Sequence, residues 1–188
     1  MATDRREPEM KSRWMLIGAC LLLPACGTMS GMLTKNPSAT ATLAPTKGNT
    51  VSGTVHFTQK SGIVVVEAKV TGLKPNGMHG MHIHEKGNCS GDASGAGGHF
   101  NPAGSQHGAH NSPMRHGGDL GNLRVNANGF AQVLIEVVDI SLGTDANSII
   151  GRAVVVHAGP DDLRSQPAGD SGARIGCGLI SKNPDKVF

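Results

Sequence analysis

From residue 50 onward, hydrophobic and polar residues alternate in short runs bounded by residues that favour turns. Alternation with a period of two predicts β-strands, because successive side chains of a strand point to opposite faces. Six runs are predicted strands: the stretch containing Val51, Val55 and Phe57, which alternate with polar neighbours, the β-branched run 62–70, and the further runs 77–84, 129–138, 151–157 and 174–180. No helical period of useful length follows residue 50. The pattern predicts an all-β domain over residues 50–188, either an antiparallel sandwich or a barrel.

Two long irregular segments interrupt the predicted strands, residues 85–117 (the first loop) and residues 158–173 (the second loop). Loops of this length inside a compact domain are usually functional. The first loop is rich in Gly, Asn and Pro and contains several histidines, and the second loop connects His157 to Arg174. We therefore expect the chemistry of the protein to depend on these two loops.

The N-terminal segment has the pattern of an export signal. Basic residues precede the apolar run 14–25, which is too short to span a bilayer. The run ends in Leu-Pro-Ala-Cys-Gly at residues 23–27, which resembles a bacterial lipobox. We expect residues 1–25 to be a signal peptide and Cys26 to be lipidated, with localisation in the bacterial cell envelope or periplasm. The alternative is an ordinary secretory signal in which Cys26 is incidental.

Residues 26–49 are rich in Thr, Ala, Pro and Ser and show no periodicity, so we expect a flexible tether there. Of the four cysteines, Cys20 lies in the predicted signal and Cys26 would carry lipid. Cys89 and Cys177 remain as a pair in an oxidising compartment, which predicts a disulfide between them. Such a bond closes a long loop, worth roughly 4–5 kcal/mol in the chain-entropy model.

Composition supports the β prediction and excludes one class of partner. The 27 glycines, 10 prolines and 3% aromatic residues are typical of short strands joined by many turns. The formal net charge is +3, but the basic residues are scattered and do not alternate with aromatic residues. The chain therefore lacks the pattern of a nucleic-acid-binding surface.

Candidate metal ligands are concentrated in one stretch: His82, His84, His99, His107, His116 and Asp119 lie within 38 residues, and His157 follows alone. His82 and His84 are two apart on a predicted strand, so they point to the same face and can bind one metal. Imidazole suits copper and zinc, and a carboxylate can complete a zinc site. This number of ligands is enough for two metal ions.

Residues 77–180 resemble the bacterial, exported copper/zinc superoxide dismutases. The resemblance depends on Gly-Met-His-Gly-Met-His-Ile-His at 77–84, Gly-Gly-His-Phe-Asn-Pro at 97–102, His-Gly-Gly-Asp-Leu-Gly-Asn at 116–122, Gly-Arg-Ala-Val-Val-Val-His at 151–157 and Gly-Ala-Arg-Ile-Gly-Cys-Gly at 172–178. It implies a Greek-key barrel or sandwich of eight antiparallel strands. It also implies one copper and one zinc per chain and superoxide as substrate.

The resemblance assigns a role to each candidate. It makes His82, His84, His99 and His157 copper ligands, and His99, His107, His116 and Asp119 zinc ligands. His99 would bridge both metals and take up a proton when copper is reduced. Asp161 would link a copper-ligand histidine to a zinc-ligand histidine, Arg174 would anchor the superoxide anion, and Cys89 and Cys177 match the family's disulfide.

Other titratable residues have simpler interpretations, and some properties stay open. We expect His56 and His110 to be exposed, His79 to be structural and Asp162 to be a solvated acid. A non-catalytic protein that stores or delivers copper and zinc is the alternative function, and a copper-only dismutase is a lesser one. The second loop lacks the steering pattern of the animal enzymes, with Arg164 its only extra cation. A homodimer and a monomer are both compatible with the sequence.

Overall fold

Eight antiparallel strands and one 3-10 turn make up the regular structure of residues 36–184, the part of the chain that this computed structural model describes. The elements are β1 (Ser38–Pro45), β2 (Ser52–Lys60), β3 (Ile63–Thr71), β4 (Met78–His84), the 3-10 turn η1 (Ser94–Ala96), β5 (Asp119–Arg124), β6 (Ala131–Val137), β7 (Ala153–His157) and β8 (Arg174–Lys182). The all-β prediction is confirmed.

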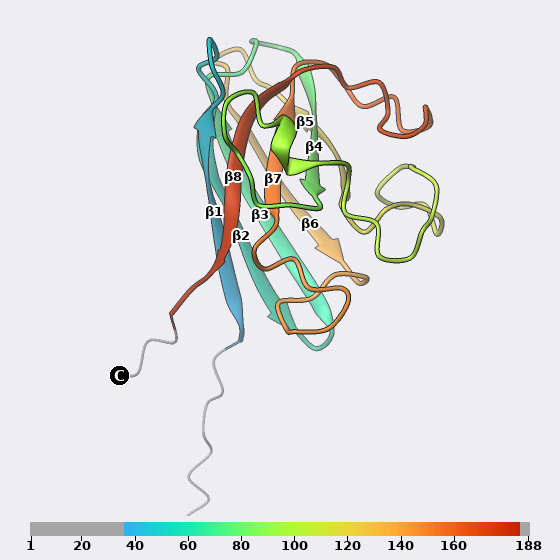
Figure 1. Cartoon of the computed structure of the whole chain (residues 1–188). Helices are drawn as coiled ribbons and strands as arrows, with labels where there is room; N and C mark the ends of the chain where they lie inside the picture. The colour runs from blue at the N-terminus through green and yellow to red at the C-terminus, as the bar shows by residue number, and fades with distance from the viewer. Residues whose placement is uncertain (1–35, 185–188) are drawn as a thin grey trace, which may run out of the picture. The chain divides into compact units, whose positions relative to one another are not determined.

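The strands form one sheet in the order β5-β4-β7-β8-β1-β2-β3-β6. The two end strands, β5 and β6, approach each other, so the sheet curls into a nearly closed barrel (Figure 1). Because β7 returns to lie beside β4, and β5 meets β6 where the barrel closes, strands β4 to β7 follow the order 7-4-5-6 of a Greek key. The two long loops project from one side of the barrel in Figure 1.

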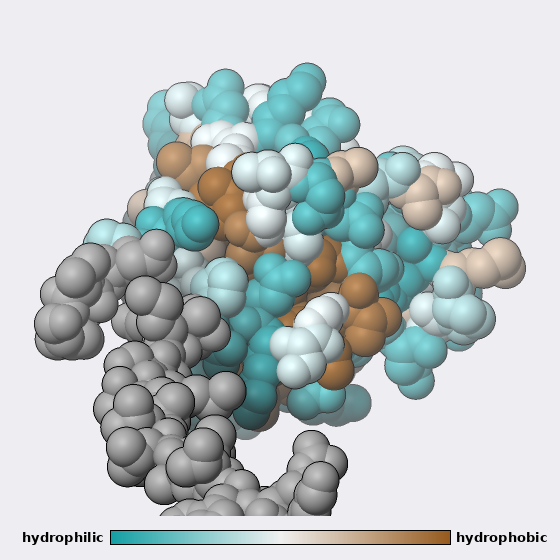
Figure 2. Space-filling model, turned by 90° about the horizontal axis from the view of Figure 1, so that it is seen from below, coloured by the Kyte–Doolittle hydropathy of each residue, from teal (hydrophilic) through white to brown (hydrophobic). Residues whose placement is uncertain are grey.

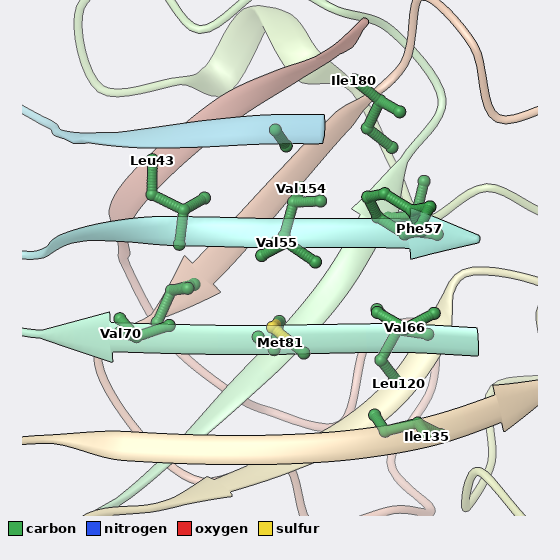
Figure 3. Close-up of a cluster of buried hydrophobic side chains, with 14 of the residues drawn as sticks. Leu43, Val55, Phe57, Val66, Val70, Met81, Leu120, Ile135, Val154 and Ile180 are labelled. Atoms are coloured by element: carbon green, nitrogen blue, oxygen red, sulfur yellow. The ribbon is translucent and has the colours of Figure 1, made fainter. Parts of the chain in front are cut away.

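The alternating residues fill the barrel interior. In β3, Val64, Val66, Ala68 and Val70 are fully buried, and their neighbours are more exposed. Figure 3 shows Val66 and Val70 in one cluster with Met81 of β4 and Val154 of β7. Burying a Val or Met side chain stabilises a fold by about 1.5–3 kcal/mol. In Figure 2, hydrophobic residues are visible at one end of the barrel among hydrophilic ones.

The predicted tether is wrong for residues 38–45, because this segment forms β1 and pairs with both β2 and β8. Ala39, Ala41 and Leu43 are buried on its inner face. The segment mixes threonines, which favour strands, with alanines and a proline, which are depleted in them, and its two neighbours supply the hydrogen bonds and the packing that hold it. The domain therefore includes Ser38, whereas the rest of the predicted tether before residue 36 lies outside the described residues.

Strand β5 is the other element that the periodicity did not indicate. Its residues Asp119–Arg124 are mostly buried on both faces and include no β-branched residue, so neither alternation nor a β-branched run marks them. The predicted signal peptide and Cys26 lie outside the described residues. In residues 36–184, no helix has the length and hydrophobicity needed to cross a membrane.

Candidate metal centre

Strands β4, β5 and β7 and the first loop bring all seven candidate ligands into one buried region. His82 and His84 come from β4, which is buried over six of its seven residues, and His157 is the last residue of β7 beside it. His99 lies in the first loop, and a backbone β-bridge to His84 holds it beside β4. The expected pairing of His82 with His84 is therefore realised, with ring centroids 6.5 Å apart.

The seven side chains form two groups that share one histidine. Within each group, one donor atom from every residue lies within 4.8 Å of the others, and all the residues are buried. The first group contains His82, His84, His99 and His157, and the second group contains His99, His107, His116 and Asp119. These are the two ligand sets expected from the sequence.

In the first group, the outward nitrogen of each non-shared ring is fixed by an acceptor. The Nδ1–H of His84 donates to the Gly97 carbonyl at 2.9 Å, and that of His157 donates to the Gly172 carbonyl at 3.1 Å. The Nε2 atoms of these two rings then face each other at 3.3 Å, each presenting a lone pair. The Nε2–H of His82 donates to Asp161 Oδ2 at 2.8 Å, which leaves its Nδ1 free to bind a metal.

In the second group, three Nδ1 atoms surround one oxygen of Asp119. Asp119 Oδ1 lies 2.9 Å from His99, 3.0 Å from His107 and 3.3 Å from His116. The other oxygen of Asp119 accepts the backbone N–H groups of Gly108 and His116. Three imidazoles with one carboxylate are a tetrahedral zinc set, whereas four imidazoles suit copper.

Unpartnered buried nitrogens support metal binding. Among the described residues, six buried ring nitrogens have no hydrogen-bond partner, and four of them belong to the two groups: His82 Nδ1, His99 Nε2, His107 Nδ1 and His116 Nδ1. Leaving a buried polar atom unpaired costs about 1–3 kcal/mol. A metal ion at each group would bind these atoms, so the residues present fit copper and zinc.

The local environment keeps the rings of His84, His99 and His157 neutral, as metal ligands must be. Burial lowers the pKa of His84 to about 2, of His157 to about 3 and of His99 to about 4, and the neighbouring rings add to this effect. Burial opposes ionisation of Asp119, but hydrogen bonds from His116, His99 and the backbone outweigh it and lower the pKa of this carboxyl. The second group therefore contains a carboxylate at neutral pH.

Asp161 joins the two groups. It is 3% exposed, and it accepts His82 Nε2–H on Oδ2 and His107 Nε2–H, at 2.9 Å, on Oδ1. Asn122 of β5 holds its backbone, because the Asn122 amide donates to the Asp161 carbonyl and accepts the Asp161 N–H. Asp161 thus contacts one histidine of each group, as the resemblance implies, whereas Asn122 was not singled out.

Arg174 is held rigidly beside the first group. It is the first residue of β8 and pairs with His157. Its guanidinium donates to the carbonyls of Ala93, Ser94 and Gly97 in the first loop. The Cys89–Cys177 disulfide, with a Cα–Cα distance of 5.6 Å, ties the same loop to β8 and confirms the predicted pairing.

Two cavities open beside these residues. One, of about 260 Å³, is lined by Arg174 together with Asp92, Ser94, Gly172 and Ala173. The other, of about 300 Å³, is lined by His157 and residues of the second loop. A small anion therefore has space next to the guanidinium of Arg174. Asp92, which faces Arg174, was not indicated by the sequence.

The remaining histidines and Asp162 lie outside both groups. His56 is exposed, as predicted, and His79 is buried with its Nδ1–H donating to the His157 carbonyl at 2.8 Å. The prediction of an exposed His110 is wrong, since it is half-buried and its Nδ1 is enclosed. Asp162 is exposed but accepts hydrogen bonds from Ser165 and Arg164, which lower its pKa to about 2.

A nearly closed antiparallel barrel with two adjoining groups of metal-ligating side chains is typical of β-barrel metalloproteins that bind two different metals. The sequence model of the family described as copper/zinc superoxide dismutase (SODC) matches residues 51–180. The chain therefore belongs to the copper/zinc superoxide dismutase family, and its activity is the dismutation of superoxide with copper and zinc. The match begins after β1, so the structure adds this strand between β2 and β8.

Proposed function

We propose that the first group binds copper, that the second group binds zinc, and that His99 serves both in an exported, lipid-anchored superoxide dismutase. The observation that carries the assignment is the sharing of His99 between two groups with different donor sets. Copper supplies one-electron redox chemistry, which oxidises one superoxide to dioxygen and reduces the next to hydrogen peroxide, and zinc has no redox role.

His99 is the residue that handles a proton. Its Nδ1 is directed at the second group, and its buried Nε2 is directed at the first group and has no hydrogen-bond partner. While Nδ1 holds the ring in place, Nε2 can take up a proton in one half of the cycle and release it in the other. Peroxide formation consumes two protons per turnover, so a proton held beside the substrate assists the second half.

Arg174 is the anion anchor. Three backbone carbonyls hold the guanidinium in one orientation at the edge of a cavity, so no further ordering is needed when an anion arrives. The group keeps its charge at every relevant pH. Enzymes of this type approach the diffusional ceiling of about 10⁸–10⁹ M⁻¹s⁻¹, where the field over the approach matters more than tight binding.

Export and lipidation rest on the N-terminal sequence, and the disulfide supports an oxidising compartment. Cleavage before Cys26 removes the single Trp of a chain that has no Tyr. The mature protein should therefore absorb very weakly at 280 nm and should label with palmitate in bacteria. A Cys26→Ala variant should be released from the membrane. Strong 280 nm absorbance of the mature protein, or unchanged membrane retention of the variant, would contradict this proposal.

Metal analysis combined with a superoxide assay tests the site assignment. We expect one copper and one zinc per chain and fast dismutation. His84→Ala should lose copper and keep zinc, and His116→Ala should lose zinc first, with His56→Ala as the control for an exposed histidine. Zinc binding without dismutation would instead indicate metal storage or delivery. Loss of the wrong metal in either variant would contradict the assignment.

A further inference from the structure

The side-chain amide of Gln166 forms two hydrogen bonds with the backbone of His107. Gln166 Oε1 accepts the His107 N–H at 2.9 Å, and Gln166 Nε2 donates to the His107 carbonyl at 2.9 Å. The two residues are 59 positions apart and belong to the second and first loops, which lie on the same side of the barrel in Figure 1. One amide therefore joins the two loops at a residue of the second group.

The ring of His107 is held by the second loop as well. Its Nε2–H donates to Asp161 Oδ1, and its Nδ1 lies 3.0 Å from Asp119. Gly169 packs against this contact so closely that a Cβ there would lie 1.9 Å from Asp161 Oδ1 and 2.7 Å from His107 Nε2. Asp161 thus fixes the orientation of the ring, and Gln166 fixes the position of the backbone that carries it.

Gln166 also holds its own loop. Its Nε2 donates to the Arg164 carbonyl at 3.1 Å, in addition to the His107 carbonyl. The residue is exposed as a whole and contributes nothing to the barrel interior. Removing its side chain would leave the His107 N–H and carbonyl, in a residue only 4% exposed, without their partner. The fold should survive this change, whereas the position of His107 should not.

We infer that Gln166 is a positioning residue that couples zinc binding at the second group to the ordering of the second loop. The inference rests on the proposed zinc binding by His107. Coupling between two sites is reciprocal, so zinc should order the second loop to the same extent that the ordered loop strengthens zinc binding. The same loop, with Gln166 in it, lines the 300 Å³ cavity beside His157 of the first group.

The first test measures zinc affinity by competition with a chromophoric chelator. Gln166→Ala should bind zinc about tenfold more weakly, the lower end of the range for groups that support a metal ligand. Gln166→Glu keeps the acceptor for the His107 N–H but loses the donor, so its affinity should be intermediate. Ser165→Ala is the matched control, because it breaks a bond to Asp162 within the same loop and does not touch His107.

Two readouts separate positioning from general stability. Cobalt(II) in the second group should show a changed visible spectrum in Gln166→Ala and an unchanged one in Ser165→Ala. Trypsin cleavage after the exposed Arg164, followed by mass spectrometry, reports the order of the second loop. Zinc should slow this cleavage in the parent protein and should slow it less in Gln166→Ala.

The outcomes distinguish the inference from the proposed function. If the parent protein binds zinc and His116→Ala does not, the zinc assignment stands. Parent-like zinc affinity, cobalt spectrum and zinc-dependent protection in Gln166→Ala would then overturn the role of Gln166. Equal losses in Ser165→Ala and Gln166→Ala would also overturn it, since they would reflect the loop in general. If His116→Ala binds zinc normally, the ligand assignment itself fails.

Discussion

Replacing Asp161 by Asn tests how the two groups depend on one buried carboxylate. Asp161 accepts the Nε2–H of both His82 and His107, and burial leaves no water to replace it. An Asn of the same shape has one carbonyl oxygen, and its NH₂ group would face one of the two ring N–H donors. That ring must then rotate or place its proton on Nδ1, the atom that should bind metal. Asp161→Asn should therefore weaken metal binding without changing the packing volume.

The expected magnitude follows from the bond that is lost. A hydrogen bond to a charged group contributes about 1.5–3 kcal/mol, which corresponds to roughly 10- to 150-fold in affinity. This agrees with the 10- to 100-fold range typical of groups that support a metal ligand. Zinc should be affected more than copper. In the first group, His84 and His157 keep the carbonyl partners that fix their tautomers. In the second group, the ring of His107 has only Asp161 as the acceptor for its Nε2–H.

Zinc and copper affinities, measured by chelator competition, provide the assay, with Asp162→Asn as the control. Asp162 is the neighbouring carboxylate, but it is exposed and bonds only to its own loop. We expect Asp162→Asn to keep parent-like affinities. Parent-like zinc affinity in Asp161→Asn would refute the argument that this carboxylate holds the ring of His107. Equal losses in both variants would show that negative charge in the loop matters rather than the specific contact.

Three further predictions concern acid, the disulfide and the anion anchor. Burial lowers the folded-state pKa of His84, His99 and His157, so the unfolded chain binds more protons than the folded one below pH 6.5. As the pH falls towards these folded pKa values, the free energy of unfolding of the metal-free protein should drop by up to about 1.4 kcal/mol per pH unit for each ring. Urea unfolding at pH 7 and pH 5 measures this loss. Higher stability at pH 5 would contradict it. Replacing Cys89 and Cys177 by Ser should lower the free energy of unfolding by roughly 4–5 kcal/mol, and an unchanged denaturation midpoint would be the opposite result. Arg174→Ala should sharply lower dismutation with unchanged copper content, and Arg174→Lys should recover part of it through charge alone; full activity in Arg174→Ala would exclude the anchor role.

The sequence was sufficient for the fold class and for both ligand groups, and each success has a physical reason. Strand parity places His82 and His84 on one face, and alternation together with short apolar runs bounded by turn residues identified six of the eight strands. The division of the ligands between two metals came from the family resemblance, because spacing cannot reveal that His157 returns to β4 through the sheet. Strand β1 was missed because two of its three inward residues are alanines and one of its two partner strands, β8, lies far along the chain.

The residues that support the ligands were the hardest to predict. Gln166 and Asn122 act through side-chain amides on the backbones of His107 and Asp161, at separations of 59 and 39 residues. Nothing in the local sequence distinguishes these amides from ordinary surface residues. Such contacts depend on how two loops meet in space, and only the structure contains that information.

Strands and loops make different contributions to holding the ligand rings. The strands fix the backbone of His82, His84 and His157, but the acceptors that orient these rings come from the loops: Gly97 from the first loop, and Asp161 and Gly172 from the second. The disulfide and Arg174 fasten the first loop to β8, and Gln166 fastens the two loops together. A barrel that is folded but has loose loops would therefore present the ligands on the correct strands with unfixed tautomers. Variants of Gln166 should consequently lose zinc affinity before they lose the fold.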